Sequence, residues 1–170
     1  MPLTPVHALS LMFLYFKGKN RTDLLALTVS STFVDLEPLY YILIGEPLDH
    51  RIWHGFALTL TIYPVLSALG VYIAEHYFEQ KLWSAYKFFR LKPNQVKYSL
   101  LTIYLWSLFG SFSHILFDML THETMPYVIY PLVFGNPFYF IQVSVIANTA
   151  TILLAIYSCL LWLKARNQEP

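Results

Sequence analysis

The sequence has little charge. Only 12% of its 170 residues are charged, roughly half the share of a soluble domain, whereas 56% are hydrophobic. This composition excludes a soluble globular domain. The net charge of +1 is spread over several short segments and leaves no basic face for a polyanion, so we expect no nucleic-acid partner.

Residue types that form common motifs are also scarce. The single cysteine, Cys159, lies in the last apolar stretch and is interpreted as a packing residue, which excludes an internal disulfide and a cysteine-based metal cluster. The chain has no glycine-rich phosphate loop, nucleophile elbow or dinucleotide fingerprint. The first residues lack the basic start and cleavage site of a signal peptide, so we expect them to belong to the mature protein.

Long apolar runs dominate the remaining sequence. A helix of about 20 residues crosses a hydrocarbon core of about 30 Å, and four runs reach that length. They are Leu24–Ile44, Gly55–Ala74, Tyr98–Leu120 and Phe138–Leu163. A shorter run, Leu3–Phe16, is predicted to form an N-terminal half-helix, since Pro2 and Pro5 suit a helix start. The sequence therefore predicts one all-α integral membrane bundle over residues 1–170, with about four spanning helices.

The distribution of lysine and arginine predicts the orientation of this bundle. Basic residues precede the first run, separate the second from the third, and follow the fourth. By contrast, Gly45–His54 contains one arginine and Thr121–Pro137 contains none, so the positive-inside rule places both loops outside a plasma (inner) membrane. The connection Glu75–Lys97 mixes aromatic and basic residues, which is typical of an amphipathic helix on anionic headgroups.

Ionisable residues within or near the apolar runs are the candidate functional groups, because burying them in a membrane is costly. They are Asp35, Glu37, His114 and Asp118 within the runs, and His7, His50, His54, His122 and Glu123 near their ends. At about 1.5 Å per helical residue, Asp35 lies about 16 Å and His114 about 24 Å from the cytoplasmic end. If the half-helix descends to the cytoplasmic side, His7 lies level with Asp35. These residues are therefore expected to gather in the outer half of the membrane.

The spacing of these residues points to a metal. His114 and Asp118 are four residues apart, so an imidazole and a carboxylate share one helical face, and His50 and His54 have the same spacing. A mixed imidazole and carboxylate set suits Zn²⁺, with Mn²⁺ or Fe²⁺ as alternatives, better than Ca²⁺. The predicted metal ligands are His7, Asp35, His50, His54, His114 and Asp118. Asp35 and Glu37 are the predicted catalytic carboxylates.

At these positions the sequence resembles a group of bacterial and archaeal membrane-bound metal-dependent hydrolases, which includes a LexA-binding inner-membrane family and related families of unknown function. The resemblance rests on Thr-Pro-Val-His ending at His7, Val-Asp-Leu-Glu-Pro around Asp35, His50-Arg51-Ile52-Trp53-His54, Ser113 to Thr121, and Tyr130-Pro131-Leu132. The segment from Ser113 to Thr121 is the most specific and is similar to Ser-His-x-x-x-Asp-x-x-Thr. Val34 stands where the group has proline, and the paired-histidine segment is one residue short, so His54 aligns better than His50.

The resemblance implies a helical membrane hydrolase distantly related to zinc-dependent phospholipase C and P1 nuclease, with histidine and aspartate ligands. Our hypothesis is a membrane-embedded metal-dependent hydrolase that acts on a lipid or phosphoester at the outer half of the membrane. Two alternatives use the same polar cluster: a small proton-coupled transporter, and a non-catalytic membrane scaffold. In the scaffold, the buried carboxylates would pair fully with the histidines.

Overall fold

A computed structural model describes residues 4–46, 51–92 and 97–167. Within these ranges every regular element is helical and no strand occurs, which confirms the predicted all-α class for the described residues. The elements are α1 (Thr4–Leu11), α2 (Phe13–Gly18), α3 (Leu24–Phe33), α4 (Leu36–Leu43), α5 (Phe56–Thr59), α6 (Ile62–Tyr77), α7 (Glu79–Phe88), α8 (Leu100–Thr121) and α9 (Ile141–Arg166), with 3₁₀ turns at Lys19–Arg21 and Ile52–His54.

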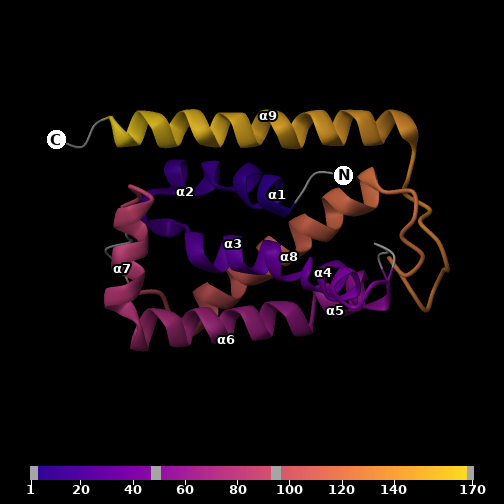
Figure 1. Ribbon diagram of the computed structural model, residues 1–170, viewed down its shortest axis with the longest axis horizontal. Coiled ribbons are helices and arrows are strands. Elements are labelled where there is room, and N and C mark those ends of the chain that lie inside the picture. The colour runs from indigo at the N-terminus through magenta and orange to yellow at the C-terminus, as the bar shows by residue number, and fades with distance from the viewer. Residues whose placement is uncertain (1–3, 47–50, 93–96, 168–170) are drawn as a thin grey trace.

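The long helices form an elongated bundle (Figure 1). Helix α9 runs along one edge and α6 along the opposite edge, while α8 crosses between them and contacts α3, α6 and α9. Helices α1 and α2 pack against α9, and α1 also packs against α3. Helix α7 lies across one end, called the basic end, and the opposite end holds α4, α5 and residues 122–140 and is called the loop end.

Helix α9 has the reverse of the residue pattern of a soluble protein. Its buried residues are small, at a helical spacing: Ser144, Ala147, Thr151, Ala155 and Ser158. Large apolar side chains on its other faces are exposed, including Ile146 at 69% and Leu153 at 60%. Small residues at a helix interface with large apolar residues outside are typical of helices packed in lipid.

Three helices in the described part of the chain are long and apolar enough to cross a membrane. They are Phe56–Tyr77, which joins α5 and α6, Leu100–Thr121 and Ile141–Arg166. Together with the exposed apolar surface of α9, these lengths and compositions are those of a membrane protein. The three spans correspond to the last three apolar runs of the sequence.

The first predicted span, Leu24–Ile44, is divided into two helices. Helix α3 ends at Phe33, and α4 begins at Leu36 after a turn in which Asp35 has φ −77° and ψ 1°. Pro38 explains the break, because in a continuous helix its ring would collide with the carbonyl of Val34. Pro38 is the third residue of α4, and a backbone nitrogen in the first turn of a helix has no hydrogen-bond partner within the helix, so a proline is tolerated there. The break places Asp35 in a turn inside the bundle instead of on a straight helix.

The predicted half-helix and amphipathic helix both have counterparts. Residues 4–18 form α1 and α2, which lie beside α9 and bury His7 and Tyr15. Helix α7 has no buried residue, and it is shorter than the predicted segment Glu75–Lys97 because α6 continues to Tyr77. Within the described part of this connection, residues 79–88 therefore form one exposed helix at the basic end.

Helices α3 and α8 approach closely enough to exclude side chains at their contact. A Cβ atom on Gly110 would lie 2.5 Å from the carbonyl oxygen of Leu27 and 3.2 Å from the backbone nitrogen of Ser31. The Ser30 hydroxyl donates to the carbonyl of Ser107 at the same contact. Because α3 and α8 lie this close together, Asp35, which follows the end of α3, lies near the last turns of α8.

Gly110→Ala is expected to lower the free energy of unfolding by about 1–3 kcal/mol, because the added methyl group forces two backbones apart. Gly70→Ala is the matched control, since a Cβ on Gly70 in α6 meets nothing within 4 Å. Gly70→Ala is expected to raise the free energy of unfolding by about 0.5–1 kcal/mol, because alanine has a higher helix propensity than glycine. Unfolding of both variants in detergent by dodecyl sulfate titration measures the difference, and equal effects would contradict the close contact of α3 and α8.

Candidate metal centre

Four separate segments supply the side chains of a buried polar cluster near the loop end. His114 and Asp118 project from one face of α8 and are 1% and 2% exposed. Asp35 comes from the turn between α3 and α4, and His54 from the 3₁₀ turn before α5. His7 comes from α1 and is also buried. The structure thus brings together five of the six predicted ligands.

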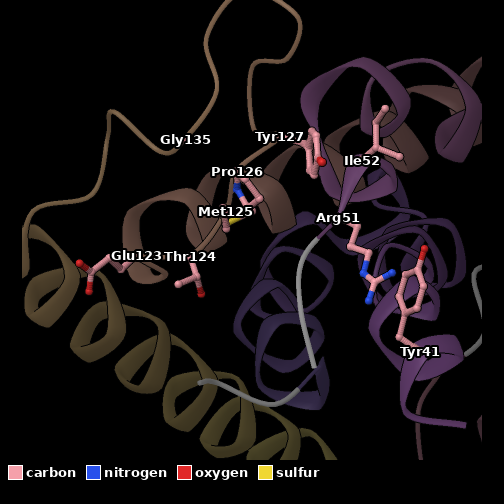
Figure 2. Close-up of a pocket in the computed structure, with 9 residues that line it drawn as sticks. All are labelled: Tyr41, Arg51, Ile52, Glu123, Thr124, Met125, Pro126, Tyr127 and Gly135. Carbon is pink, nitrogen blue, oxygen red and sulfur yellow. The ribbon is translucent and has the colours of Figure 1, made fainter. Parts of the chain in front are cut away.

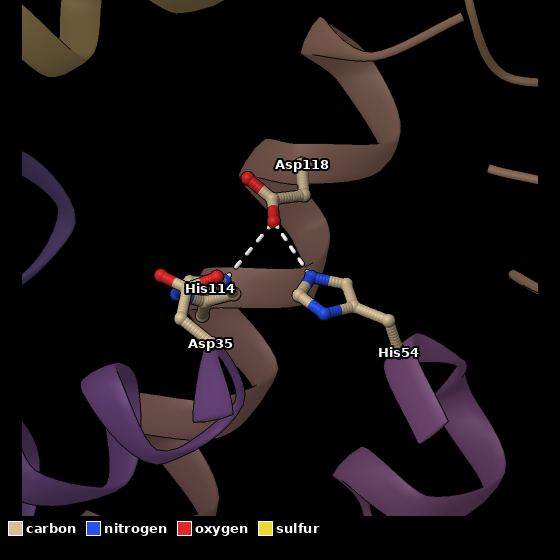
Figure 3. A group of neighbouring side chains, drawn as sticks. All are labelled: Asp35, His54, His114 and Asp118. Atoms are coloured by element: carbon tan, nitrogen blue, oxygen red, sulfur yellow. Dashed lines mark hydrogen bonds and ion pairs between the residues drawn. The ribbon is translucent and has the colours of Figure 1, made fainter. Parts of the chain in front are cut away.

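Asp118 is at the centre of the cluster (Figure 3). Its Oδ2 atom lies 2.8 Å from His54 Nε2 and 3.0 Å from His114 Nε2. Its Oδ1 atom lies 3.1 Å from His7 Nε2. A single carboxylate therefore faces three imidazole rings, each through the same type of ring nitrogen.

Asp35 completes a set of groups with the separations that a metal requires. Its Oδ1 atom is 3.2 Å from His114 Nε2. One ligand atom from each of Asp35, His54, His114 and Asp118 can be chosen so that all lie within 4.8 Å of one another. Tetrahedral ligands at zinc distances are about 3.3 Å apart, so this set needs only small movements to surround one ion. The ring of His7 lies 4.7 Å from that of His114, which places it at the edge of the set.

The hydrogen-bond geometry distinguishes this cluster from a set of paired residues. His54 Nε2 and Asp118 form a hydrogen bond. The Nε2 atoms of His7 and His114 lie 3.1 and 3.0 Å from Asp118 oxygens, within ion-pair distance. Their Nδ1 atoms are buried with no hydrogen-bond partner among the described residues. Unpaired buried imidazole nitrogens are costly unless another group binds them.

The charge of the cluster also fits a cation. Asp35 and Asp118 carry two negative charges when ionised, and neutral imidazoles do not offset them. Among the described residues, the side chains within ion-pair distance of Asp118 are all histidines. Buried carboxylates are stable only when paired or bound to metal, so a divalent ion would balance the site.

Glu37 lies on the far side of His54 from Asp118. Its Oε2 atom is 3.8 Å from His54 Nδ1, whereas His54 Nε2 faces Asp118. Its two oxygens accept hydrogen bonds from the backbone nitrogens of Arg51 and Trp53, at 3.3 and 3.1 Å. A carboxylate behind a histidine fixes the orientation of the ring, so this position fits a positioning residue better than the proton-transfer role predicted from sequence.

Glu37→Gln is expected to weaken metal affinity about 10–100-fold, as loss of a carboxylate behind a metal-binding histidine does elsewhere. Glu46→Gln is the matched control, because Glu46 is exposed and pairs with Arg51 at 3.0 Å outside the cluster. Zinc titration against a competing chelator measures both affinities. An unchanged affinity in Glu37→Gln would show that Glu37 does not orient His54.

The remaining predicted residues lie around this cluster or outside the described ranges. His122 caps α8, with Nδ1 3.6 Å from Asp118 Oδ1, and burial lowers the pKa of its imidazole. Glu123 is exposed beside it. His50 lies outside the described residues. His76 is near the basic end of α6, where its ring stacks on Tyr72 away from the cluster.

An open pocket of about 680 Å³ lies at the loop end beside the cluster (Figure 2). Tyr41 and Arg51 line one side, and Glu123 and Thr124 line the other. The guanidinium of Arg51 is 3.9 Å from the centre of the Tyr41 ring, and its hydrogen bond to Glu46 raises the pKa of this half-buried side chain. Arg51 is three residues from His54, so the pocket and the cluster share one segment. No sequence pattern indicated this pocket, because its lining residues come from separate segments.

The loop over the pocket is held on the cluster by close backbone contacts. Gly55 leaves no room for a side chain, because a Cβ there would lie 2.5 Å from the carbonyl oxygen of Tyr127. The backbone nitrogen of Phe56 donates to the carbonyl of Val128 at 2.9 Å. Asn136 donates through Nδ2 to the carbonyls of Met119 and His122, both at 2.7 Å. Sequence analysis overlooked Asn136, which anchors the loop to the end of α8.

These features define an all-helical membrane protein with a buried histidine and aspartate cluster next to an open pocket. The chain belongs to the family described as a domain of unknown function (DUF4184), whose profile matches residues 1–169. No curated protein and no solved structure matches the chain.

Proposed function

We propose that this protein is a membrane-embedded, metal-dependent hydrolase that cleaves a phosphoester of a lipid at the loop end of the bundle. The observation that carries the proposal is the arrangement of three buried imidazoles around Asp118, in which one ligand atom each from Asp35, His54, His114 and Asp118 lie within 4.8 Å of one another. A scaffold would hold these side chains by pairing them with each other and would bind no ion. The sequence resemblance to membrane-bound metal-dependent hydrolases supports the same conclusion.

The metal would be held by His54, His114, Asp118 and Asp35, with His7 as a further ligand. Mixed nitrogen and carboxylate oxygen ligands favour Zn²⁺, and Mn²⁺ or Fe²⁺ are the alternatives. When bound, such an ion polarises a phosphoryl oxygen and makes water a nucleophile at neutral pH. His50 remains a predicted ligand that lies outside the described residues.

The side chains of the pocket would bind and orient the substrate. Arg51 would hold the phosphate, since a guanidinium matches its geometry, and Tyr41 fixes the guanidinium plane. Asp35 has a side chain that is 17% exposed, compared with 3% for Asp118, so it is the carboxylate of the cluster that an entering water reaches. Asp118 and Glu37 would hold the imidazoles in place.

The lipid substrate is supported by the surroundings of the pocket. Exposed apolar side chains lie close in sequence to the lining residues, with Leu43 at 76% exposure two residues after Tyr41 and Leu132 at 85% three residues before Gly135. Such residues are costly in water and suit the membrane interface, where acyl chains would lie beside them. A soluble phosphoester would gain nothing from these contacts.

The proposed topology has the loop end outside the plasma membrane and the basic end in the cytoplasm. Helices α3 and α4 together would make a fourth, broken crossing, and α1 with α2 would enter the membrane from the side of the loop end. Broken helices at membrane depth are tolerated where they line a buried polar site, as the turn at Asp35 does.

Incubation of the purified protein with phospholipids and isoprenoid phosphates tests the proposed activity. Release of phosphate or a phosphorylated headgroup by the wild type, and not by the variant His114→Ala, Asp118→Ala, supports it. Equal release by both proteins, or none from any substrate by a metal-loaded wild type, would overturn it. Proton flux into vesicles, abolished in the same variant, would instead indicate the transporter.

A further inference from the structure

A second cavity, of about 410 Å³, lies toward the basic end of the bundle and shares no lining residue with the metal centre. It is formed where α1, α3, α9 and the segment after α7 meet, and Leu9, Met12, Leu24, Leu91 and Trp162 line it. The indole nitrogen of Trp162 donates to the carbonyl of Phe89 at 2.8 Å and closes one side. The lining is mainly apolar, so it suits a hydrocarbon chain.

Two exposed cations lie at the aromatic rings beside this cavity. Lys17 Nζ lies 5.9 Å from the centre of the Tyr157 ring, and the guanidinium of Arg166 lies 5.9 Å from that of Trp162. Neither cation has an acidic partner among the described residues, whereas Lys97 at the same end pairs with Glu79 at 3.0 Å. Lys17 and Arg166 therefore have positive charge available for an anion.

We propose that this cavity binds an acyl chain of an anionic phospholipid whose phosphate lies between Lys17 and Arg166. The combination of an apolar cavity inside the bundle with unpaired cations at its rim complements both parts of such a lipid. Basic pockets between membrane helices on the cytoplasmic side bind anionic headgroups in this way. The site is independent of the hydrolase proposal, because it shares no residue with the metal centre.

The bound lipid would hold the basic end of the bundle together. The lining residues come from three helices and the segment after α7, which are joined here by few polar contacts besides the bond from Trp162 to Phe89. An acyl chain between them buries apolar surface on all of these elements at once. Occupation is therefore expected to raise the melting temperature as well as to give measurable binding.

Native mass spectrometry of the detergent-purified protein measures this binding, with dioleoyl phosphatidylglycerol and dioleoyl phosphatidylcholine as probes. The wild type is expected to bind the anionic lipid more tightly. Lys17→Gln with Arg166→Gln is expected to reduce that affinity about thirtyfold, since each cation near the surface contributes about fivefold. The matched control, Lys81→Gln with Lys97→Gln, removes two cations from the same end and is expected to change it less than about twofold.

A second variant tests the cavity separately from the charge. Cys159 lines the cavity and is exposed, so Cys159→Trp is expected to fill the space without disturbing a buried group. It should weaken binding of both lipids. Equal affinity of the wild type for the two lipids, an equal loss in the control, or unchanged binding by Cys159→Trp would each overturn the proposal.

Discussion

Removal of metal from the wild-type protein is expected to lower its melting temperature by about 8–16 °C. A ligand present at a thousand times its dissociation constant stabilises the folded state by about 4 kcal/mol, and a chain of this length shifts by about 2–4 °C per kcal/mol. Without the ion, Asp35 and Asp118 repel each other inside the bundle, and the buried Nδ1 atoms of His7 and His114 have no hydrogen-bond partner among the described residues. Thermal unfolding in detergent, with and without a chelator, measures the shift.

The variant Asp118→Asn provides the control for this experiment. Because Asp118 contacts three imidazoles, its loss is expected to remove the metal, and the chelator should then have no effect. In the chelator-treated wild type, added zinc should restore the original melting temperature and added magnesium should not. That difference would identify the nitrogen-rich site as the origin of the stabilisation. The prediction would be contradicted if the melting temperature of the wild type were the same with and without the chelator.

Asp118→Asn is also expected to reduce hydrolysis by more than about 100-fold. Loss of a carboxylate that only supports a metal ligand costs about 10–100-fold, and Asp118 lies within 3.1 Å of three imidazole nitrogens itself. Asparagine keeps the shape of the side chain but replaces the charged carboxylate with a neutral amide, which is a much weaker ligand for a transition metal. Initial rates with a lipid substrate identified by screening measure the effect.

Asp23→Asn is the matched control, because Asp23 is as buried as Asp118 but lies at the basic end. Its Oδ1 atom caps α3 by accepting from the backbone nitrogen of Ala26 at 3.0 Å, and asparagine caps helices equally well. Burial raises the pKa of Asp23 to about 6, so the folded protein tolerates a neutral group there. The rate should stay within about twofold of wild type. Equal losses in both variants would indicate general damage to the bundle.

Much of the fold could be predicted from the lengths of the apolar runs. The last three runs form helices that are long enough to span, because each contains about 20 mostly apolar residues, although the run Gly55–Ala74, which contains Pro64, is divided into α5 and α6. The break at Asp35 was foreseeable from Pro38, which permits a helix start but not a helix interior. The inward face of α9 was also foreseeable, since Ala147, Thr151 and Ala155 recur every four residues.

The composition of the cluster could be predicted, but its internal arrangement could not. Loop charge and depth along the helices predicted that His7, Asp35, His54, His114 and Asp118 gather in one half of the bundle, and the structure brings these five side chains together. Depth carries no information about rotation, so the central position of Asp118 depends on how α8 packs against α3 and α1. The location of Glu37 behind His54 depends on the irregular backbone of residues 51–54, for which no periodic pattern exists.

The open pocket was the least predictable feature for the same reason. Tyr41, Arg51 and Tyr127 come from three segments that are far apart in sequence or irregular in structure. Their proximity depends on contacts such as that of Gly55 with the backbone of Tyr127. Hydrophobic patterns determine which face of a regular helix is buried, but they do not determine the path of a loop.

The most direct test of the metal centre is the metal content of the purified protein, measured by plasma mass spectrometry. The wild type is expected to contain about one or two equivalents of a transition metal, most of it zinc, as in other carboxylate and histidine sites. The variant His114→Ala, Asp118→Ala should contain none, and Asp23→Asn should match the wild type. Absence of metal from all three proteins after growth and loading with zinc would contradict the account and favour a proton relay or a scaffold.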